Sequence, residues 1–179
     1  MRPLYLLLIP LLAAAQVLPV VVDFEGPAVL LSPGDKANRV EQWEDQGVVF
    51  KLAHDPRSTK AKGLVMFFEH LSNGHKGIGS AMALEQIPVR ATFAKPAATV
   101  TVSFWGSTGT PALLEAFDAE GKVVDRAALP AAPSRKAPGD PVPTFTLTVN
   151  AKRIAYIQFS GPRPGEYLAA DEVRYTPAE

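Results

Sequence analysis

The segment ATVTVSFW, residues 98–105, decides the fold class of this chain. Val100, Val102 and Phe104 alternate with hydroxyl side chains, and Thr and Val are both branched at Cβ. A period of two with β-branched residues is typical of a strand that buries one face and exposes the other. We therefore expect a β-strand here, and such a strand needs neighbours with which to pair.

Short runs of the same kind recur on both sides of this strand, separated by turn signals. They are VLPVVVDF (17–24), QGVVFKLA (46–53), GLVMFF (63–68), a weaker SAMALE (80–85), VRATFA (89–94), ALLEAFD (112–118), KVVDRA (122–127), TFTLTV (144–149), RIAYIQFS (153–160) and EYLAADEVRY (166–175). HLSNGHKGIGS (70–80) and the proline-rich stretch 129–143 are predicted to be loops. About ten short strands without an amphipathic helix predict an all-β sandwich or barrel.

The first 15 residues have the pattern of a secretory signal peptide. Arg2 supplies the positive start, and LYLLLIPLLAAA (4–15) supplies a short apolar core that ends in small residues. We expect cleavage after Ala15, a single β-sandwich domain over residues 16–179 and a secreted or periplasmic location in a bacterium. The alternative is an uncleaved anchor, which the prolines near this segment disfavour.

Composition excludes several classes of function. Lys and Arg together number 18, as do Asp and Glu, so no net field steers the chain towards nucleic acid or an anionic membrane. The chain has no cysteine, which excludes disulfides, thiolate zinc sites and cysteine nucleophiles. No second segment is long and apolar enough to predict a transmembrane helix.

A family resemblance rests on the hairpin EAFDAEGKVV (115–124), in which Gly121 is available for a positive φ. This segment resembles a hairpin of secreted bacterial jelly-roll domains, which are similar to galactose-binding-like and carbohydrate-binding-module sandwiches of PEP-CTERM-associated proteins. Further matches follow in the same order: DFEG (23–26), QGVVF (46–50), IPVRATFAKPAATVTVSF (87–104), FTLTV (145–149), RIAYIQFSG (153–161) and YLAADEVRY (167–175). The resemblance implies a jelly-roll β-sandwich of about ten short antiparallel strands. It does not extend to a PEP sorting tail.

Asp171 is a candidate site residue because it lies in the inward register of the last predicted strand. Strand alternation places it on the otherwise apolar face formed by Tyr167, Ala169, Val173 and Tyr175, with Glu172 and Arg174 facing outward. A buried carboxylate is costly unless it is paired, hydrogen-bonded or bound to a metal. Asp171 therefore either caps backbone N–H groups or pairs with Arg39 or Arg174, or it binds a cation.

The resemblance favours calcium as that cation. In the resembled sandwiches the first and last strands lie together, and a structural calcium is held by an acid from each strand and by backbone carbonyls. Glu25 and Asp171 are the implied side-chain ligands, with Asp23, Asp35 and Asn38 as further candidates. Calcium needs about six to eight hard oxygen ligands of this kind. Asp23 and Glu25 also share one face if VVDFEG (21–26) is a strand.

The predicted function is an exported, non-catalytic β-sandwich module that binds a glycan or an envelope protein, or is structural, and is stabilised by calcium. A first alternative is a carbohydrate-binding module in which Trp105, at the rim, stacks on a sugar and His75 lines the site. Trp43 is typical of a core residue instead. A second alternative is a small envelope hydrolase, although no Gly-x-Ser-x-Gly elbow and no His-Glu-x-x-His motif occur.

Overall fold

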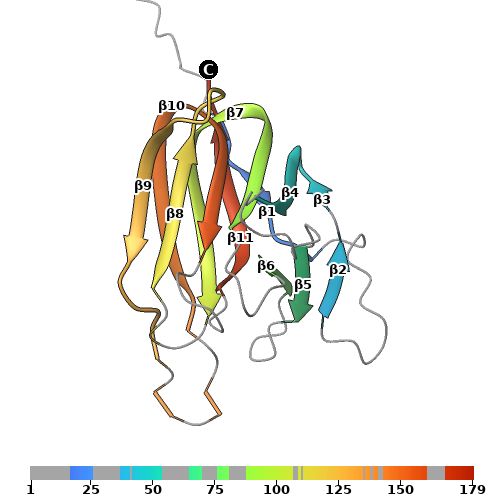
Figure 1. The fold of residues 1–179 in the computed structure, drawn as a ribbon, viewed down its shortest axis with the longest axis vertical. Helices are drawn as coiled ribbons and strands as arrows, with labels where there is room; N and C mark the ends of the chain where they lie inside the picture. The colour runs from blue at the N-terminus through green and yellow to red at the C-terminus, as the bar shows by residue number, and fades with distance from the viewer. Residues whose placement is uncertain are drawn as a thin grey trace, which may run out of the picture.

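The computed structural model describes residues 17–25, 37–40, 42–53, 65–69, 76–80, 88–106, 109, 111–134, 136–137, 139–140, 143–160 and 168–179. These residues form β-strands and no helix (Figure 1). The strands are β1 (Val20–Val22), β2 (Ala37–Val40), β3 (Trp43–Asp45), β4 (Val48–Leu52), β5 (Val65–Glu69), β6 (Lys76–Ser80), β7 (Val89–Gly106), β8 (Ala112–Phe117), β9 (Val123–Leu129), β10 (Phe145–Ser160) and β11 (Leu168–Pro177). All their pairings are antiparallel.

The long strands β7 and β10 run through both layers of the fold. They pair along most of their length, but the register shifts between Asn150 and Ile154 and again before Tyr156. The first half of β7 and the second half of β10 lie in the strand order β3-β4-β7-β10-β8-β9, which we call the first layer. Their other halves lie in the order β2-β5-β6-β11-β7-β10, the second layer, where β1 also pairs with β11.

The hydrophobic core lies between these two layers. Phe104, in the second-layer half of β7, contacts Phe159, in the first-layer half of β10, with ring centroids 5.4 Å apart. Phe93 of the first layer and Tyr175 of the second are likewise 4.9 Å apart. Both layers contribute alternate side chains to one buried cluster, which is the packing expected of a sandwich. The predicted all-β jelly-roll sandwich is thereby confirmed.

Several strand predictions need correction in detail. The runs 89–94 and 98–105 are one strand, as are 144–149 and 153–160. Pro96 is tolerated within β7 because it lies where the strand bends between the layers and its pairing is interrupted. Strands β2 and β3 lie in segments that were not predicted as strands.

Strand β6 corrects the prediction that residues 70–80 are a loop. Its sequence KGIGS looks like a turn because of its two glycines. Gly77, however, is buried, and a Cβ atom there would lie 3.0 Å from the carbonyl oxygen of Ala170 and 3.3 Å from Nε1 of Trp105. Glycine is therefore required for the close approach of β6 to its neighbours rather than for a turn.

The segment VVDFEG folds differently from an ideal strand. Strand β1 ends at Val22, and Phe24 takes a φ of 60°, in the left-handed region that is rare for an aromatic residue. The side chain of Asp23 stabilises this turn, because its Oδ1 accepts the backbone N–H of Glu25 at 3.1 Å. Phe24 is fully buried while Asp23 and Glu25 are exposed. The two acids thus point away from Phe24, as predicted, but by means of a turn.

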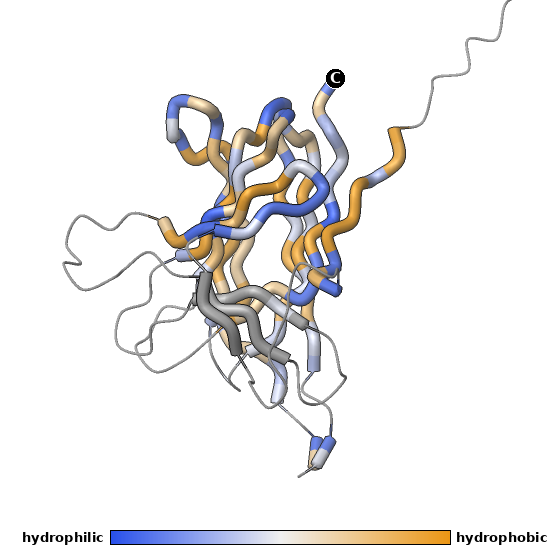
Figure 2. The backbone as a smooth tube through the Cα atoms, turned by 90° about the vertical axis from the view of Figure 1, so that its right-hand side faces the viewer, coloured by the Kyte–Doolittle hydropathy of each residue, from blue (hydrophilic) through white to orange (hydrophobic). Residues whose placement is uncertain are grey.

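The apolar stretch that leads into VVDFEG begins at Val17, the first described residue. Val17 and Leu18 are exposed, and together with β1 they form a largely hydrophobic segment, drawn mostly in orange in Figure 2. The predicted signal peptide itself lies outside the described residues, so cleavage and export stay predictions. The described residues contain no helix long and apolar enough to cross a membrane.

Tyr175 fastens the last strand to the turn between β3 and β4. Gln46 and Gly47 have φ values of 49° and 73°, as in a two-residue type I′ hairpin turn. The Tyr175 hydroxyl donates a hydrogen bond of 2.8 Å to the carbonyl oxygen of Gln46. This contact connects a strand of the second layer to a turn of the first.

This contact predicts a loss of stability in alkaline solution. Burial raises the pKa of Tyr175 above its ordinary value of 10.0. Stability from Tyr175 is therefore complete below the unfolded-state pKa and is lost as pH rises through the folded-state pKa. We expect the melting temperature to fall less steeply above pH 10 in Tyr175→Phe, which should also be about 1 kcal/mol less stable at neutral pH. Parallel melts of the parent chain and the variant check this, and identical alkaline slopes would contradict it.

Candidate functional site

The predicted junction of the first and last strands is present. Val20 pairs with Tyr175 and Val22 with Val173. Asp171 is only 8% exposed, the one buried polar or charged side chain among the described residues. It is the extra residue of a β-bulge, because the register shifts between Ala170 and Glu172. Its predicted burial is therefore confirmed, although the bulge interrupts the strict alternation from which it was predicted.

The structure places several of the residues that were considered together with Asp171. Arg174, a proposed partner, instead donates from Nε and Nη2 to the carboxylate of Glu172, and this bond raises the pKa of Arg174. Both side chains lie on the outer face of β11, as predicted. Glu25 and Asp23 are exposed at the end of β1.

Two of the five predicted ligands cannot be placed as side chains. Asp35 lies outside the described residues, and Asn38 lies in β2, where only the backbone is described. Among the residues that are described, no three His, Cys, Asp or Glu side chains form a group suited to a metal. Calcium binding by Glu25 and Asp171 stays a prediction.

The two tryptophans are both buried. Trp43, 7% exposed, packs against Phe24 and Phe50 with centroid distances of 5.2 and 5.6 Å, which confirms its place in the core. Trp105 is 4% exposed at the end of β7, beside Gly77. Its ring is therefore shielded in this conformation, unlike an open rim residue. His75 lies outside the described residues, so a ligand role for either residue stays a prediction.

The outer face of the first layer carries a continuous row of polar side chains. Cross-strand partners point to the same face of a sheet, and the observed registers join five such partners in line across five strands. From β4 to β9 the row is Lys51, Arg90, Gln158, Glu115 and Arg126. Their sequence neighbours Phe50, Ala91, Ile157 and Ala116 are buried in the core, so the row points outward. We call these five residues the polar row.

An aromatic stack lies beside the polar row. The Tyr156 ring stacks on Phe117 with a centroid distance of 4.7 Å and an angle of 7°. The guanidinium of Arg90 packs over the same Tyr156 ring, with its Cζ 3.5 Å from the ring centroid. Cation–π and ring stacking of this kind orient the guanidinium and the two rings. The stack thus positions Arg90, the second member of the polar row.

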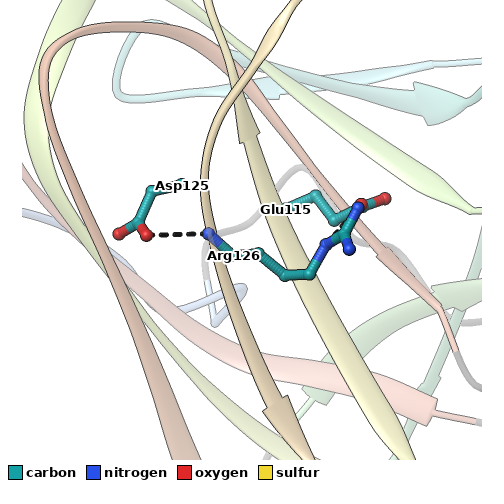
Figure 3. Close-up of polar contacts among 3 residues, drawn as sticks. All are labelled: Glu115, Asp125 and Arg126. Carbon is teal, nitrogen blue, oxygen red and sulfur yellow. Dashed lines mark hydrogen bonds and ion pairs between the residues drawn. The ribbon is translucent and has the colours of Figure 1, made fainter.

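The far end of the row is an ion pair. Arg126 donates from Nε and Nη2 to Oε1 of Glu115, at 2.9 and 2.6 Å. Figure 3 shows that the neighbouring Asp125 points to the opposite side of β9. Asp125 accepts the backbone N–H of Arg126 at 2.8 Å and that of Asn150, in the second-layer half of β10, at 2.6 Å. It therefore connects β9, at the edge of the first layer, to the second-layer half of β10.

The outer face of the second layer is chemically different. Hydroxyl side chains alternate along β7 and β10, and some of them form hydrogen bonds across the two strands. The Thr101 and Thr148 hydroxyls lie 2.9 Å apart, and Thr99 donates to Oδ1 of Asn150 at 2.9 Å. These groups already have partners within the sheet.

The polar row is not visible in the sequence alone. Its members occur singly on five strands, each as an ordinary outward residue of an alternating pattern. Only the pairing register brings them into line, and register is set by tertiary packing and turns. The alternation itself is the available signal, because it predicts which face each residue takes.

Comparison with known proteins gives only distant likenesses. The chain matches no protein-family model and no curated protein. Similar solved structures include a family 29 carbohydrate-binding module (TM-score 0.42, 16% identity, 80% of this chain and 94% of that one). They also include the cleaved adhesin domain of Lys-gingipain from Porphyromonas gingivalis (0.42, 12%, 90% and 99%) and TmCBM61 in complex with beta-1,4-galactotriose (0.36, 9%, 78% and 88%). At these identities and TM-scores the likeness carries no argument about ligand or activity.

Proposed function

We propose that this chain is an exported, non-catalytic binding module whose ligand is a glycan lying along the polar row. The observation that carries this proposal is the alignment of five polar side chains across β4, β7, β10, β8 and β9, next to an ordered aromatic stack. An extended polymer can contact such a row at successive residues, and the rigid sheet keeps the spacing constant.

The chemistry of the row suits sugar hydroxyls, which both donate and accept hydrogen bonds. Lys51 and Arg90 are donors, Glu115 is an acceptor, and the Gln158 amide at the centre is both. Specificity in small-molecule sites comes from a few polar groups placed on an otherwise apolar surface. Here the half-buried Phe117 ring supplies the apolar component beside the polar groups, and it stacks against Tyr156, which is only 8% exposed.

A binding role fits the row better than hydrolysis does. Glycoside hydrolysis generally uses two carboxyl groups that face each other across the sugar. Within the polar row the acid is Glu115 alone, and its Oε1 accepts both bonds from Arg126. That carboxylate is already engaged as an ion-pair partner. We therefore propose that the face binds its ligand without chemical conversion.

The central amide provides a test of this function. Gln158→Ala should weaken binding to the glycans that the parent chain selects from an array by about tenfold, because an amide that bonds the ligand in two directions is lost. Thr146→Ala, on the exposed outer face of the second layer, is the matched control and should leave binding unchanged. Equal affinity of Gln158→Ala and the parent chain would contradict the proposed face.

Calcium remains part of this proposal as a structural ion at the β1–β11 junction. The support is the burial of Asp171 next to the end of β1. A calcium bound only by the folded state should stabilise it by about 2.7 kcal/mol at a hundredfold excess over its dissociation constant. Asp171→Asn should remove most of that gain, whereas Glu172→Gln should not, because Glu172 lies on the outer face. Melts with and without chelator measure it, and an unmoved melt would rule the ion out.

A further inference from the structure

Arg90 differs in its contacts from Arg126 and Arg174, the two arginines whose side-chain hydrogen bonds the structure shows. Arg126 and Arg174 each donate twice to a glutamate. Arg90 instead contacts the Tyr156 ring, and its Nε is buried with no hydrogen-bond acceptor among the residues that the structure describes. A buried donor without an acceptor is costly. The sheet therefore holds a fixed guanidinium whose hydrogen-bonding capacity is not used by the neighbouring described side chains.

The orientation of Arg90 leaves its N–H groups suited to a planar anion. A guanidinium that stacks on a ring uses its face, while its N–H donors lie in its own plane and point from its edge. The Tyr156 ring is in turn fixed by Phe117 on its other side. Because Nε is buried, the donors toward a ligand are the terminal Nη1 and Nη2 groups, whose parallel N–H bonds match the two oxygens of a carboxylate.

The charges around Arg90 favour the same kind of ligand. Lys51 is its direct cross-strand partner on β4, and like charges directly opposite each other destabilise a sheet. Among the described residues of the first-layer strands, two acids face the same side as Arg90. Glu115 is occupied by Arg126, and Glu44 lies on β3 opposite Val49, one row away from Lys51 and Arg90. An anion between Lys51 and Arg90 would relieve their repulsion.

We propose that Arg90, Lys51 and Gln158 form a subsite for the carboxylate of an acidic sugar, so that the ligand of the polar row is a polysaccharide containing uronic acid units. This inference rests on the proposed function and names its ligand class. Arg90 holds the carboxylate in a two-point contact, Lys51 adds a second positive charge, and Gln158 contacts an adjacent hydroxyl. The Glu115–Arg126 pair then contacts the next sugar along the row.

The test compares one polymer in two charge states. Polygalacturonate and its methyl ester share the same backbone, and only the first carries free carboxylates. We expect the full-length chain to bind polygalacturonate at least about tenfold more tightly than the ester, because a charged hydrogen bond is lost on esterification. The difference should shrink at high salt, since exposed charges are screened. Tighter binding to dextran sulfate than to polygalacturonate would contradict the carboxylate assignment.

Variants locate the subsite on the face. Lys51→Gln, at an exposed position, should reduce the preference for the acidic polymer without disturbing the fold, and Arg90→Lys should reduce it because the ammonium lacks the planar fork. Lys152→Gln, at the exposed bend of β10, is the control and should bind like the parent chain. If the ester binds equally well and only Gln158→Ala weakens binding, the acidic subsite is wrong and the proposed function stands. If neither polymer nor any arrayed glycan binds, the proposed function fails with it.

Discussion

Phe24→Ala should lower the free energy of unfolding by about 3–5 kcal/mol, the range for removing a fully buried aromatic side chain. Phe24 is inaccessible to solvent, and its ring lies 5.2 Å from those of both Trp43 and Phe50. The substitution would leave a cavity in an aromatic cluster that joins β1, β3 and β4. Denaturant titration of the parent chain and the variant measures the difference, and a loss under about 1 kcal/mol would contradict this packing.

The left-handed backbone conformation of Phe24 allows a second test, which compares glycine with alanine at this position. At most buried sites glycine destabilises more than alanine, because it loses more conformational entropy on folding. At a φ of 60° the order should reverse, with Phe24→Gly more stable than Phe24→Ala by up to about 1 kcal/mol. Val21→Ala, at a position 38% exposed, serves as the control and should change stability by about 0.5 kcal/mol or less.

Gly121→Val should destabilise the chain by about 1–3 kcal/mol, because a β-branched residue is strained at a φ of 82°. Gly121 closes the β8–β9 turn, where its N–H donates to the Asp118 carbonyl at 3.2 Å. A Cβ atom would also lie 3.4 Å from the Tyr156 hydroxyl, so the change disturbs the aromatic stack. The confirmed hairpin therefore supports the candidate face as well as the fold.

A second substitution at Gly121 distinguishes the strain of a left-handed backbone from the effect of adding any side chain. Gly121→Asn should cost clearly less than Gly121→Val, since asparagine tolerates the left-handed region. Thermal melts of the two variants give the comparison. Equal melting temperatures for the two would show that the left-handed conformation of this turn does not limit stability.

Local patterns in the sequence were sufficient to predict the fold class and the hairpin. The alternation of Val100, Val102 and Phe104 with hydroxyl residues places the former in the core, as observed. Gly121 has the predicted positive φ. These features depend on neighbouring residues, so they are visible in a single sequence.

Other features depend on partners that are distant in the chain. Pro96 divides β7 into two apparent strands, because the bend that accommodates it exists only when each half pairs in its own layer. Strand β6 is hidden because Gly77 serves the packing of Trp105 and not a turn. The bulge at Asp171 likewise depends on its pairing with β7.

The candidate face could not be predicted for the same reason. Arg90 and Gln158 are 68 residues apart in the sequence, and the β7–β10 register places them side by side. A shift of one residue would turn Gln158 into the core and Ile157 outward. The predicted ligand Trp105 is shielded, and Tyr156, although its ring stacks with Phe117 on the outer face, is itself only 8% exposed.

The most direct test of the proposed function is to map where a bound glycan contacts the chain. Backbone amide NMR shifts during titration with the tightest-binding glycan from the array report this position residue by residue. If the glycan lies along the polar row, the largest changes will occur at that row and its neighbours on β4, β8 and the first-layer halves of β7 and β10. Changes confined to the hydroxyl face of the second layer, or to the β1–β11 junction, would contradict it.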